Sequence, residues 1–127
     1  MSLQPAWVFE VTDYAGTPVV LSRVTWHAKA GNDTLGTHPE IWSYLEDVET
    51  AMASPDLVFQ STRDARTRLF YRLRVGRGDF VGKHLVVVVK YVQSAGGQRG
   101  YVSTVYLSRA VYAQGVLLWP RTGNVPR

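Results

Sequence analysis

The sequence predicts an α+β fold in which one main N-terminal helix packs on an antiparallel sheet of about four strands. Apolar residues recur at helical spacing between Ile41 and Met52, and from residue 57 onward they alternate with a period of two. The content of 46% hydrophobic and 19% charged residues is that of an ordinary globular chain. A length of 127 residues suits one domain, so we expect residues 1–127 to fold as a single unit.

The main helix is predicted to begin at a capping box and to end before a proline. In residues 37–40 (Thr-His-Pro-Glu), the Thr37 hydroxyl can accept from the Glu40 amide while the Glu40 side chain reaches back. Pro39 falls in the first turn, where a missing N–H does no harm. Pro55 disfavours helical geometry before it and ends the helix. The apolar stripe consists of Ile41, Leu45, Val48 and Met52.

Most of the remaining chain is predicted to be extended or to form turns. The extended N-terminal segments are 6–11 and 18–26, followed by a glycine-containing loop over 27–36. The predicted strands are 57–60, 69–75, 84–93 and 101–107, with a turn over 94–100 and a short helical or irregular piece near 108–114 before 116–119. The segment 84–93 is apolar on both faces, which indicates a central strand covered on both sides.

A lysine interrupts this apolar strand. We expect Gln93 to face Tyr101 across the turn. Lys90 then lies opposite Thr104, and Tyr106 follows two residues further along the same face. This pattern favours a cation held beside a hydroxyl pair at a phosphate site. The alternative is a partly exposed lysine that extends its ammonium to water.

Two histidines bracket the glycine-containing loop. His38 lies at the start of the predicted helix, where backbone N–H groups favour an anion. Together with His27 it could act as base and acid on a bound phosphodiester, because imidazoles exchange protons near neutral pH. The alternative is that both are surface or capping residues. A zinc site that adds Glu40 is disfavoured, because His38 and Glu40 do not share a helix face, and we predict no metal and no cofactor.

The charge is divided unevenly along the chain. Residues 1–56 carry eight acidic side chains against two basic ones, a balance of −6. Residues 57–127 carry two acidic against twelve basic side chains, a balance of +10. Arginine supplies 11 of the 14 basic residues, and its planar fork matches phosphate geometry. The basic half therefore favours a polyanionic partner, with nucleic acid ahead of an acidic protein.

Six of these arginines fall between Arg63 and Arg77. One interpretation is a groove that follows phosphates, with nearby aromatic rings (Tyr71, Phe70 and Trp42) stacking on unpaired bases. The alternative is a solvated edge that resists aggregation. The candidate substrate-binding residues are Arg63, Arg66, Arg68, Tyr71, Arg72 and Arg74.

Several function classes are excluded by what the sequence lacks. The absence of cysteine excludes a disulfide scaffold, a thiolate zinc site and a cysteine nucleophile. There is no glycine-rich phosphate loop, Rossmann fingerprint or Ser/His/Asp signature. No apolar run approaches the roughly 20 residues that span a bilayer, and no signal peptide is visible. We expect a cytoplasmic protein without a membrane partner.

Taken in order, the two histidines, the lysine and the Thr-x-Tyr pair resemble the active-site series of EndoU-type ribonucleases. The wider layout resembles the barnase, EndoU, colicin and RelE fold group, and within it the small phage-associated and polymorphic-toxin nucleases. The resemblance covers roughly residues 24–119. It is carried by residues 37–40, Pro55-Asp56, Tyr71-Arg72, Val86–Val89, Thr104-x-Tyr106 and Leu118-Trp119.

The resemblance implies metal-independent cleavage of RNA that leaves a 2′,3′-cyclic phosphate. In this hypothesis the 2′-OH attacks the adjacent phosphorus, and His38 with His27 transfers protons. Lys90 and an arginine stabilise the developing charge, while Thr104 and Tyr106 position the phosphate or the base. The alternative is a non-catalytic module on the same fold that binds RNA or an acidic protein. A third possibility is a toxin held by an acidic inhibitor or immunity protein.

Overall fold

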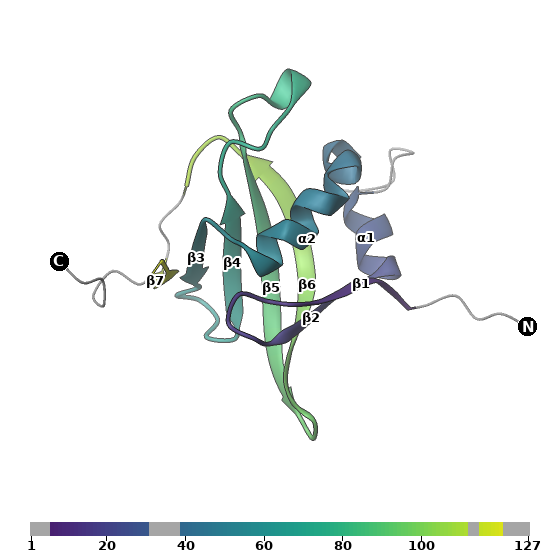
Figure 1. Ribbon diagram of the computed structural model, residues 1–127, viewed down its shortest axis with the longest axis vertical. Coiled ribbons are helices and arrows are strands. Elements are labelled where there is room, and N and C mark those ends of the chain that lie inside the picture. Colours follow the sequence, from purple (N-terminus) through teal and green to yellow (C-terminus); the bar gives the residue numbers. More distant parts are fainter. Residues whose placement is uncertain (1–5, 31–38, 112–114, 121–127) are drawn as a thin grey trace, which may run out of the picture.

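The computed structural model describes residues 6–30, 39–111 and 115–120. These residues form a seven-stranded mixed sheet with the order β1-β2-β6-β5-β4-β3-β7, accompanied by short helices (Figure 1). The strands are β1 (Trp7–Thr12), β2 (Pro18–Ser22), β3 (Leu57–Gln60), β4 (Thr67–Arg72), β5 (His84–Ser94), β6 (Gly97–Ser108) and β7 (Val116–Trp119). The α-helices are α1 (Arg23–Ala30) and α2 (Leu45–Ala53), and the 3-10 helices are η1 (Pro39–Tyr44) and η2 (Gly78–Phe80).

The predicted fold class, one N-terminal helix on an antiparallel sheet of about four strands, is wrong. The N-terminal segments are themselves part of the sheet, because β1 and β2 form an antiparallel pair and β2 then runs parallel to β6. The helix of note, α2, lies in the middle of the chain and has nine residues. Alternation marks β1 and β2 as strands, but it does not show that β2 pairs with a strand about 80 residues away.

The second correction concerns α1. The predicted extended chain over 18–26 is wrong beyond Ser22, where the chain turns into a helix instead of a strand or a loop. Ser22 caps this helix, because its Oγ accepts the backbone N–H of Thr25 at 3.0 Å. Trp26 and Ala30, one turn apart, are buried in the core. Thr25 and Trp26 favour strands, but burial of one helical face overrides that propensity.

The predicted main helix is divided into two parts. Residues 39–44 form η1, and regular α-helix begins only at Leu45. The expected end is confirmed, because α2 stops at Ala53 and the N–H of Ser54 returns to the carbonyl of Thr50 at 2.7 Å. The expected cap, which involves Thr37 and His38, lies outside the described residues. No helix within the described ranges is long and apolar enough to cross a membrane.

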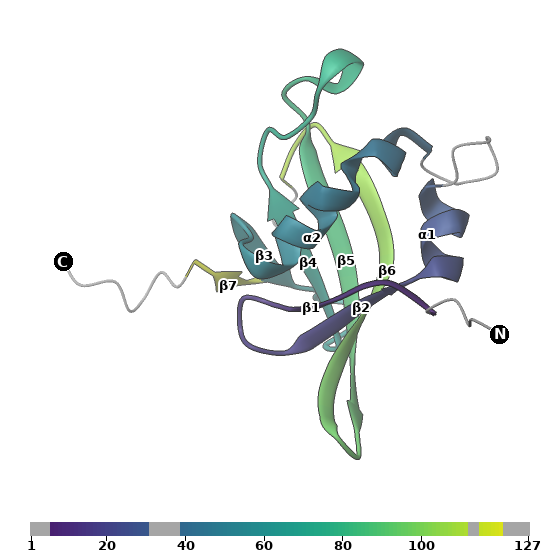
Figure 2. The same ribbon diagram turned by 45° about the vertical axis from the view of Figure 1, so that its right-hand side comes forward.

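One face of the central strands is covered by the helices and the β1–β2 hairpin, and we call it the helix-covered face. Figures 1 and 2 show α2 and this hairpin crossing the same side of β4, β5 and β6. The core beneath them joins Val48 and Met52 of α2 to Phe70, Val87 and Val89 of the sheet. All five side chains are 0% exposed, so this contact holds the two layers together.

The opposite face of the central strands, called here the second face, carries a smaller core. Phe59, Tyr71 and Val86 are buried on it. Val111, from the segment that follows β6, packs against this cluster. The surrounding apolar side chains are only partly buried, so the second face is more open to solvent than the helix-covered face. These neighbours are Leu57, Leu69, Leu73, Val88, Tyr106 and Leu117.

A buried hydrogen bond ties the β1–β2 turn to the centre of the sheet. The hydroxyl of Tyr91, on β5, donates to Asp13 Oδ2 at 2.6 Å. Asp13 is only 4% exposed, and its Oδ1 accepts the backbone N–H groups of Ala15 and Thr17 at 2.9 and 2.8 Å. Burial raises the pKa of Tyr91 far above its ordinary value, and the hydrogen bond to Asp13 raises it further. The hydroxyl therefore stays protonated and remains a donor.

The same turn is also fixed from the other side. The backbone N–H of Tyr14 donates to the carbonyl of Met52, in α2, at 2.9 Å. The Tyr14 ring lies 5.8 Å from the ring of Phe70 and 5.6 Å from that of Trp119. The turn therefore contacts the helix, the middle of the sheet and its last strand.

The hairpin can lie this close to β6 because of a glycine. Val19 of β2 pairs with Gly100 of β6. A Cβ at Gly100 would lie 2.9 Å from side-chain atoms of Val89 and Tyr91 and 3.0 Å from Val19. Those contacts are too short for any other residue without a shift of the neighbours, so glycine sets the approach of the two strands.

The Tyr91–Asp13 bond gives the first prediction. Tyr91→Phe removes the hydroxyl that donates to the buried carboxylate of Asp13, and we expect it to lower the free energy of unfolding by about 1–3 kcal/mol. Tyr101→Phe is the matched control, because Tyr101 is 37% exposed, and we expect a change within about 0.5 kcal/mol. Urea unfolding followed by fluorescence measures both, and equal losses would contradict the structural role of the bond.

Candidate nucleic-acid interface

Lys90, Thr104 and Tyr106 all lie on the second face of the sheet. Val86 belongs to the core of that face, and side chains alternate along β5, so Val88 and Lys90 lie on the same side. Tyr106 pairs with Val86 and Thr104 with Val88. The face shared by these three residues agrees with the alternation in the sequence.

The predicted pairing of Lys90 with Thr104 is wrong, because Lys90 faces Tyr101. The β5–β6 turn is shorter than expected: Ser94 pairs with Gly97, which leaves two residues between the strands. Gly97 has a φ of 110°, a conformation that favours glycine at the turn. A further shift between Val88 and Val89 changes the register once more. Lys90 consequently lies four residues, about 13 Å, from the level of Tyr106 along β5.

The ammonium of Lys90 is held near a carboxylate. Its Nζ lies 3.7 Å from Asp64 Oδ2, and the Lys90 side chain is 45% exposed. Asp64 also accepts the hydroxyl of Thr67 and the backbone N–H of Arg66, each at 3.0 Å. Thr67 lies directly opposite Lys90 on β4. A phosphate at this place would therefore share the Lys90 ammonium with Asp64.

The environment of Asp64 favours its charged form. The backbone N–H of Arg66 lowers the pKa of Asp64 most, and the Thr67 hydroxyl lowers it further. The charges of Lys90 and Arg66 act in the same direction, while desolvation opposes them. A carboxyl with a lowered pKa contributes stability above its ordinary pKa of 3.8, and this is lost as the pH falls through the lower folded-state value.

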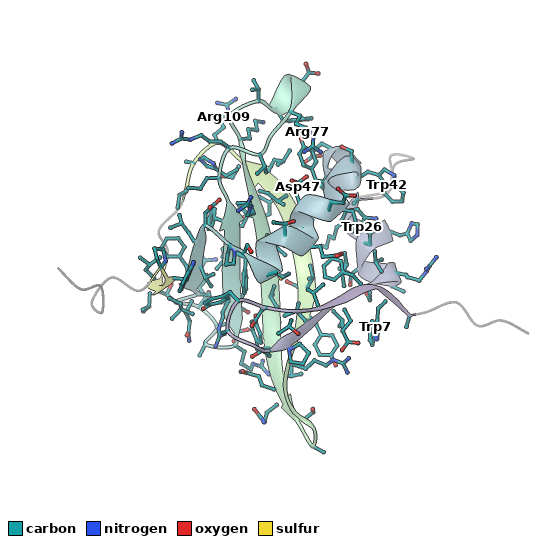
Figure 3. The ribbon with its side chains drawn as sticks, in the orientation of Figure 1. Trp7, Trp26, Trp42, Asp47, Arg77 and Arg109 are labelled. Atoms are coloured by element: carbon teal, nitrogen blue, oxygen red, sulfur yellow. The ribbon has the colours of Figure 1, made fainter. Side chains whose placement is uncertain are left out.

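Of the two candidate histidines, the structure describes His27, and His27 does not join Lys90. His27 is exposed on α1, with its ring 5.7 Å from the ring of Trp42. Trp42 in turn stacks on Trp26, with 5.8 Å between the ring centroids. Trp26 is part of the helix-covered core, and both tryptophans are labelled in Figure 3. His27 and Lys90 therefore lie on opposite sides of the sheet. His38 lies outside the described residues.

Two of the candidate arginines point to the helix-covered side. The guanidinium of Arg68 lies 4.5 Å from the centre of the Tyr91 ring. Arg72 lies 3.6 Å from Asp56 and donates to the carbonyl of Ser54 at 3.1 Å. Both guanidinium groups contact parts of the fold that close this side, and they lie away from the second face.

The other candidate arginines, Arg63, Arg66 and Arg74, are exposed. Arg66 lies 3.6 Å from Asp64 and shares that carboxylate with Lys90. Tyr71, the candidate aromatic residue among them, is 1% exposed and packs edge-on against Phe59 at 5.8 Å. The Tyr71 ring is thus enclosed in the smaller core, and its burial leaves no open ring face for a base.

Basic side chains without a carboxylate partner lie at both ends of the second face. Within residues 57–111, ion pairs occupy Arg66, Arg72, Arg77, Lys90 and Arg99. The described structure gives no ion pair to Arg74, Lys83 and Arg109, which lie where β4 ends, β5 begins and β6 ends. Arg109 is labelled at this end of the molecule in Figure 3. Arg63 lies at the other end, in the β3–β4 loop.

His84 also lies on the second face, although the sequence pattern did not single it out. It begins β5, pairs with Ser108, and alternates with Val86 onto the side of Lys90. Its Nδ1 accepts the backbone N–H of Arg74 at 2.9 Å. The even spacing of residues 84 and 90 along one strand is a signal that could have indicated this shared face.

Among the described residues, no three His, Asp or Glu side chains are placed to hold a metal ion. No family model matches the chain, and no curated protein or solved structure matches it.

The carboxylate beside Lys90 gives the second prediction. Thr67→Val removes a hydrogen bond to Asp64, whereas Lys90→Met removes a half-exposed charge at 3.7 Å. We expect the pKa of Asp64 to rise in both variants, and to rise more in Thr67→Val, because the hydrogen bond outweighs the charge. Carboxyl ¹³C titration by NMR measures this.

The stability of the same variants provides the control. Because the Lys90–Asp64 pair is partly exposed, Lys90→Met is expected to leave the urea midpoint nearly unchanged. A large loss of stability in Lys90→Met, or a larger pKa rise in it than in Thr67→Val, would show that Lys90 is the main support of Asp64.

Proposed function

We propose that the chain binds single-stranded RNA along the second face of the sheet. The observation that carries the proposal is the set of exposed or half-exposed cations without carboxylate partners at both ends of this face. They are Arg74, Lys83 and Arg109 at one end and Arg63 at the other. His84 and Lys90 mark the two ends on β5, six residues apart, which corresponds to about 20 Å. A single-stranded RNA that spans this distance can place one phosphate near Arg63 and another near the three cations at the other end.

The middle of the face suits unpaired bases. Tyr106, Val88 and Leu69 are partly buried there among apolar side chains, and Thr104 is the strand partner of Val88. Bases stack on aromatic and apolar surfaces with little dependence on sequence, whereas a duplex keeps its bases paired and enclosed. These features favour a single strand. The choice of RNA over DNA comes from the resemblance to ribonucleases.

Metal-independent cleavage of this RNA is the second candidate function. It is favoured by one observation: Lys90, Thr104 and Tyr106, three of the five candidate catalytic residues, share the proposed binding face. Proton transfer in this hypothesis depends on His38, because His27 lies on the other side of the sheet. A cytoplasmic location and an acidic inhibitor or immunity protein that covers the same cations belong to this proposal.

RNA binding makes the third prediction. Fluorescence anisotropy with a labelled single-stranded RNA in EDTA is expected to show binding that weakens steeply with salt. If about four phosphates are contacted, the slope of log K against log salt is about −3. Binding that does not depend on salt, or a preference for duplex RNA, would contradict the proposal.

Cleavage is tested in the same mixtures. If the chain is a ribonuclease, products that end in a 2′,3′-cyclic phosphate appear in EDTA. We then expect His38→Ala and Lys90→Met each to slow their formation by a factor of about 100 or more. RNA that stays bound and intact identifies a binding module. Cleavage that is unchanged in both variants would exclude the candidate catalytic residues.

A further inference from the structure

Four residues with phosphate-binding side chains lie at neighbouring strand ends, at the end of the second face where β5 begins. Arg74 follows β4, Lys83 precedes β5, and Arg109 follows β6. His84 connects them: its ring accepts the backbone N–H of Arg74, and its strand partner is Ser108, the residue before Arg109. Residues from three strand ends are thus brought together in one place.

The hydrogen bond that His84 accepts from Arg74 selects the tautomer of its imidazole ring. Because Nδ1 accepts the N–H of Arg74 at 2.9 Å, it carries no proton, and the proton of the neutral ring is on Nε2. That Nε2–H is a donor with no hydrogen-bond partner in the described structure. The His84 side chain is partly exposed, so a ligand can reach it.

Arg74 lies in the turn that follows β4 and has a strained backbone conformation. Its φ is 56°, in the left-handed region, and it is the only non-glycine residue with positive φ among the described residues. Glycine adopts this conformation without the strain that a side chain adds. The Arg74 side chain is exposed, so it does not contribute to packing. Strain kept at an exposed arginine indicates a functional position.

The charge around these residues is left positive by the fold. The nearby Asp56 is occupied by Arg72 at 3.6 Å and by the backbone N–H of Leu73 at 2.8 Å. Asp47 is occupied by Arg77 at 3.0 Å. Asp79, which is exposed, is the carboxylate of the β4–β5 loop itself. It opposes the three cations Arg74, Lys83 and Arg109, so a net positive charge remains.

We propose that Arg74, His84 and Arg109 form a phosphate-binding site that holds one phosphodiester of the RNA on the second face. The site rests on the proposed function and specifies where the strand is anchored. The guanidinium groups supply charge-assisted donors, and the His84 Nε2–H supplies a neutral one. Lys83 adds positive charge beside them.

Arg74→Gly separates this role from folding. Glycine adopts a positive φ without strain and keeps the backbone N–H that donates to His84. We therefore expect the melting temperature to rise by about 4 °C. The same change removes a donor to phosphate, and we expect RNA affinity to fall about tenfold. Arg23→Ala is the matched control, because Arg23 is exposed on α1, and it is expected to leave RNA affinity nearly unchanged.

Two further measurements keep the site testable if the stability result is ambiguous. His84→Asn retains an acceptor near Nδ1 and loses the Nε2 donor, so it is expected to keep the melting temperature and to weaken RNA binding. Titration with inorganic phosphate, followed by the ¹⁵N signal of His84 Nε2, tests the site without RNA. The signal is expected to shift in the native chain and to shift less in Arg74→Gly.

The outcomes distinguish the site from the proposed function. If RNA binds equally to the native chain, Arg74→Gly and His84→Asn, the site is overturned while RNA binding stands. If phosphate shifts His84 but no RNA binds, the site stands and the proposed function fails. An Arg74→Gly chain that is both less stable and weaker in binding would place Arg74 in the scaffold.

Discussion

The buried contact between Tyr91 and Asp13 is the constraint on which the rest of the structure depends. It joins the first hairpin to the central strand across 78 positions of sequence. The parallel ladder between β2 and β6 has only two residue pairs, too few to fix the hairpin by itself. A buried carboxylate that lacks a hydrogen-bond partner is costly, so the Asp13 carboxylate must lie within reach of the Tyr91 hydroxyl. This requirement fixes the position of the hairpin on the sheet. The hairpin then closes the helix-covered face, while the second face stays more open to solvent.

Much of the sheet could be predicted from the sequence because alternation is a local property. The apolar run 84–93 indicates a central strand, and β5 is the fourth of seven in the sheet. The strand over 57–60 has the predicted bounds. What a strand pairs with is not local, so the parallel contact of β2 with β6 was out of reach. Helix α1 was missed for a related reason, since the burial of Trp26 decides its conformation.

The candidate site was predictable to the same degree. A period of two places Thr104 and Tyr106 on one face of β6. Whether Lys90 shares that face depends on the register, and it does so because the shift between Val88 and Val89 compensates for the changed pairing at the turn. Their spacing depended on the length of one turn and on a bulge, which the composition of the turn did not reveal. The excess of arginine was visible from the start. Which arginines are left without an acid depends on tertiary contacts such as that of Arg77 with Asp47.

The parallel contact between β2 and β6 also affects how the protein is made. Val19 needs Gly100 as its partner, so the first hairpin must wait for about 80 further residues to leave the ribosome. During that time the apolar side chains of β2, which end up 0–1% exposed, have no sheet to join. Contacts between distant residues also slow folding, because the chain entropy is lost before the contact forms. The segment 18–22 therefore needs protection from aggregation until β6 has been made.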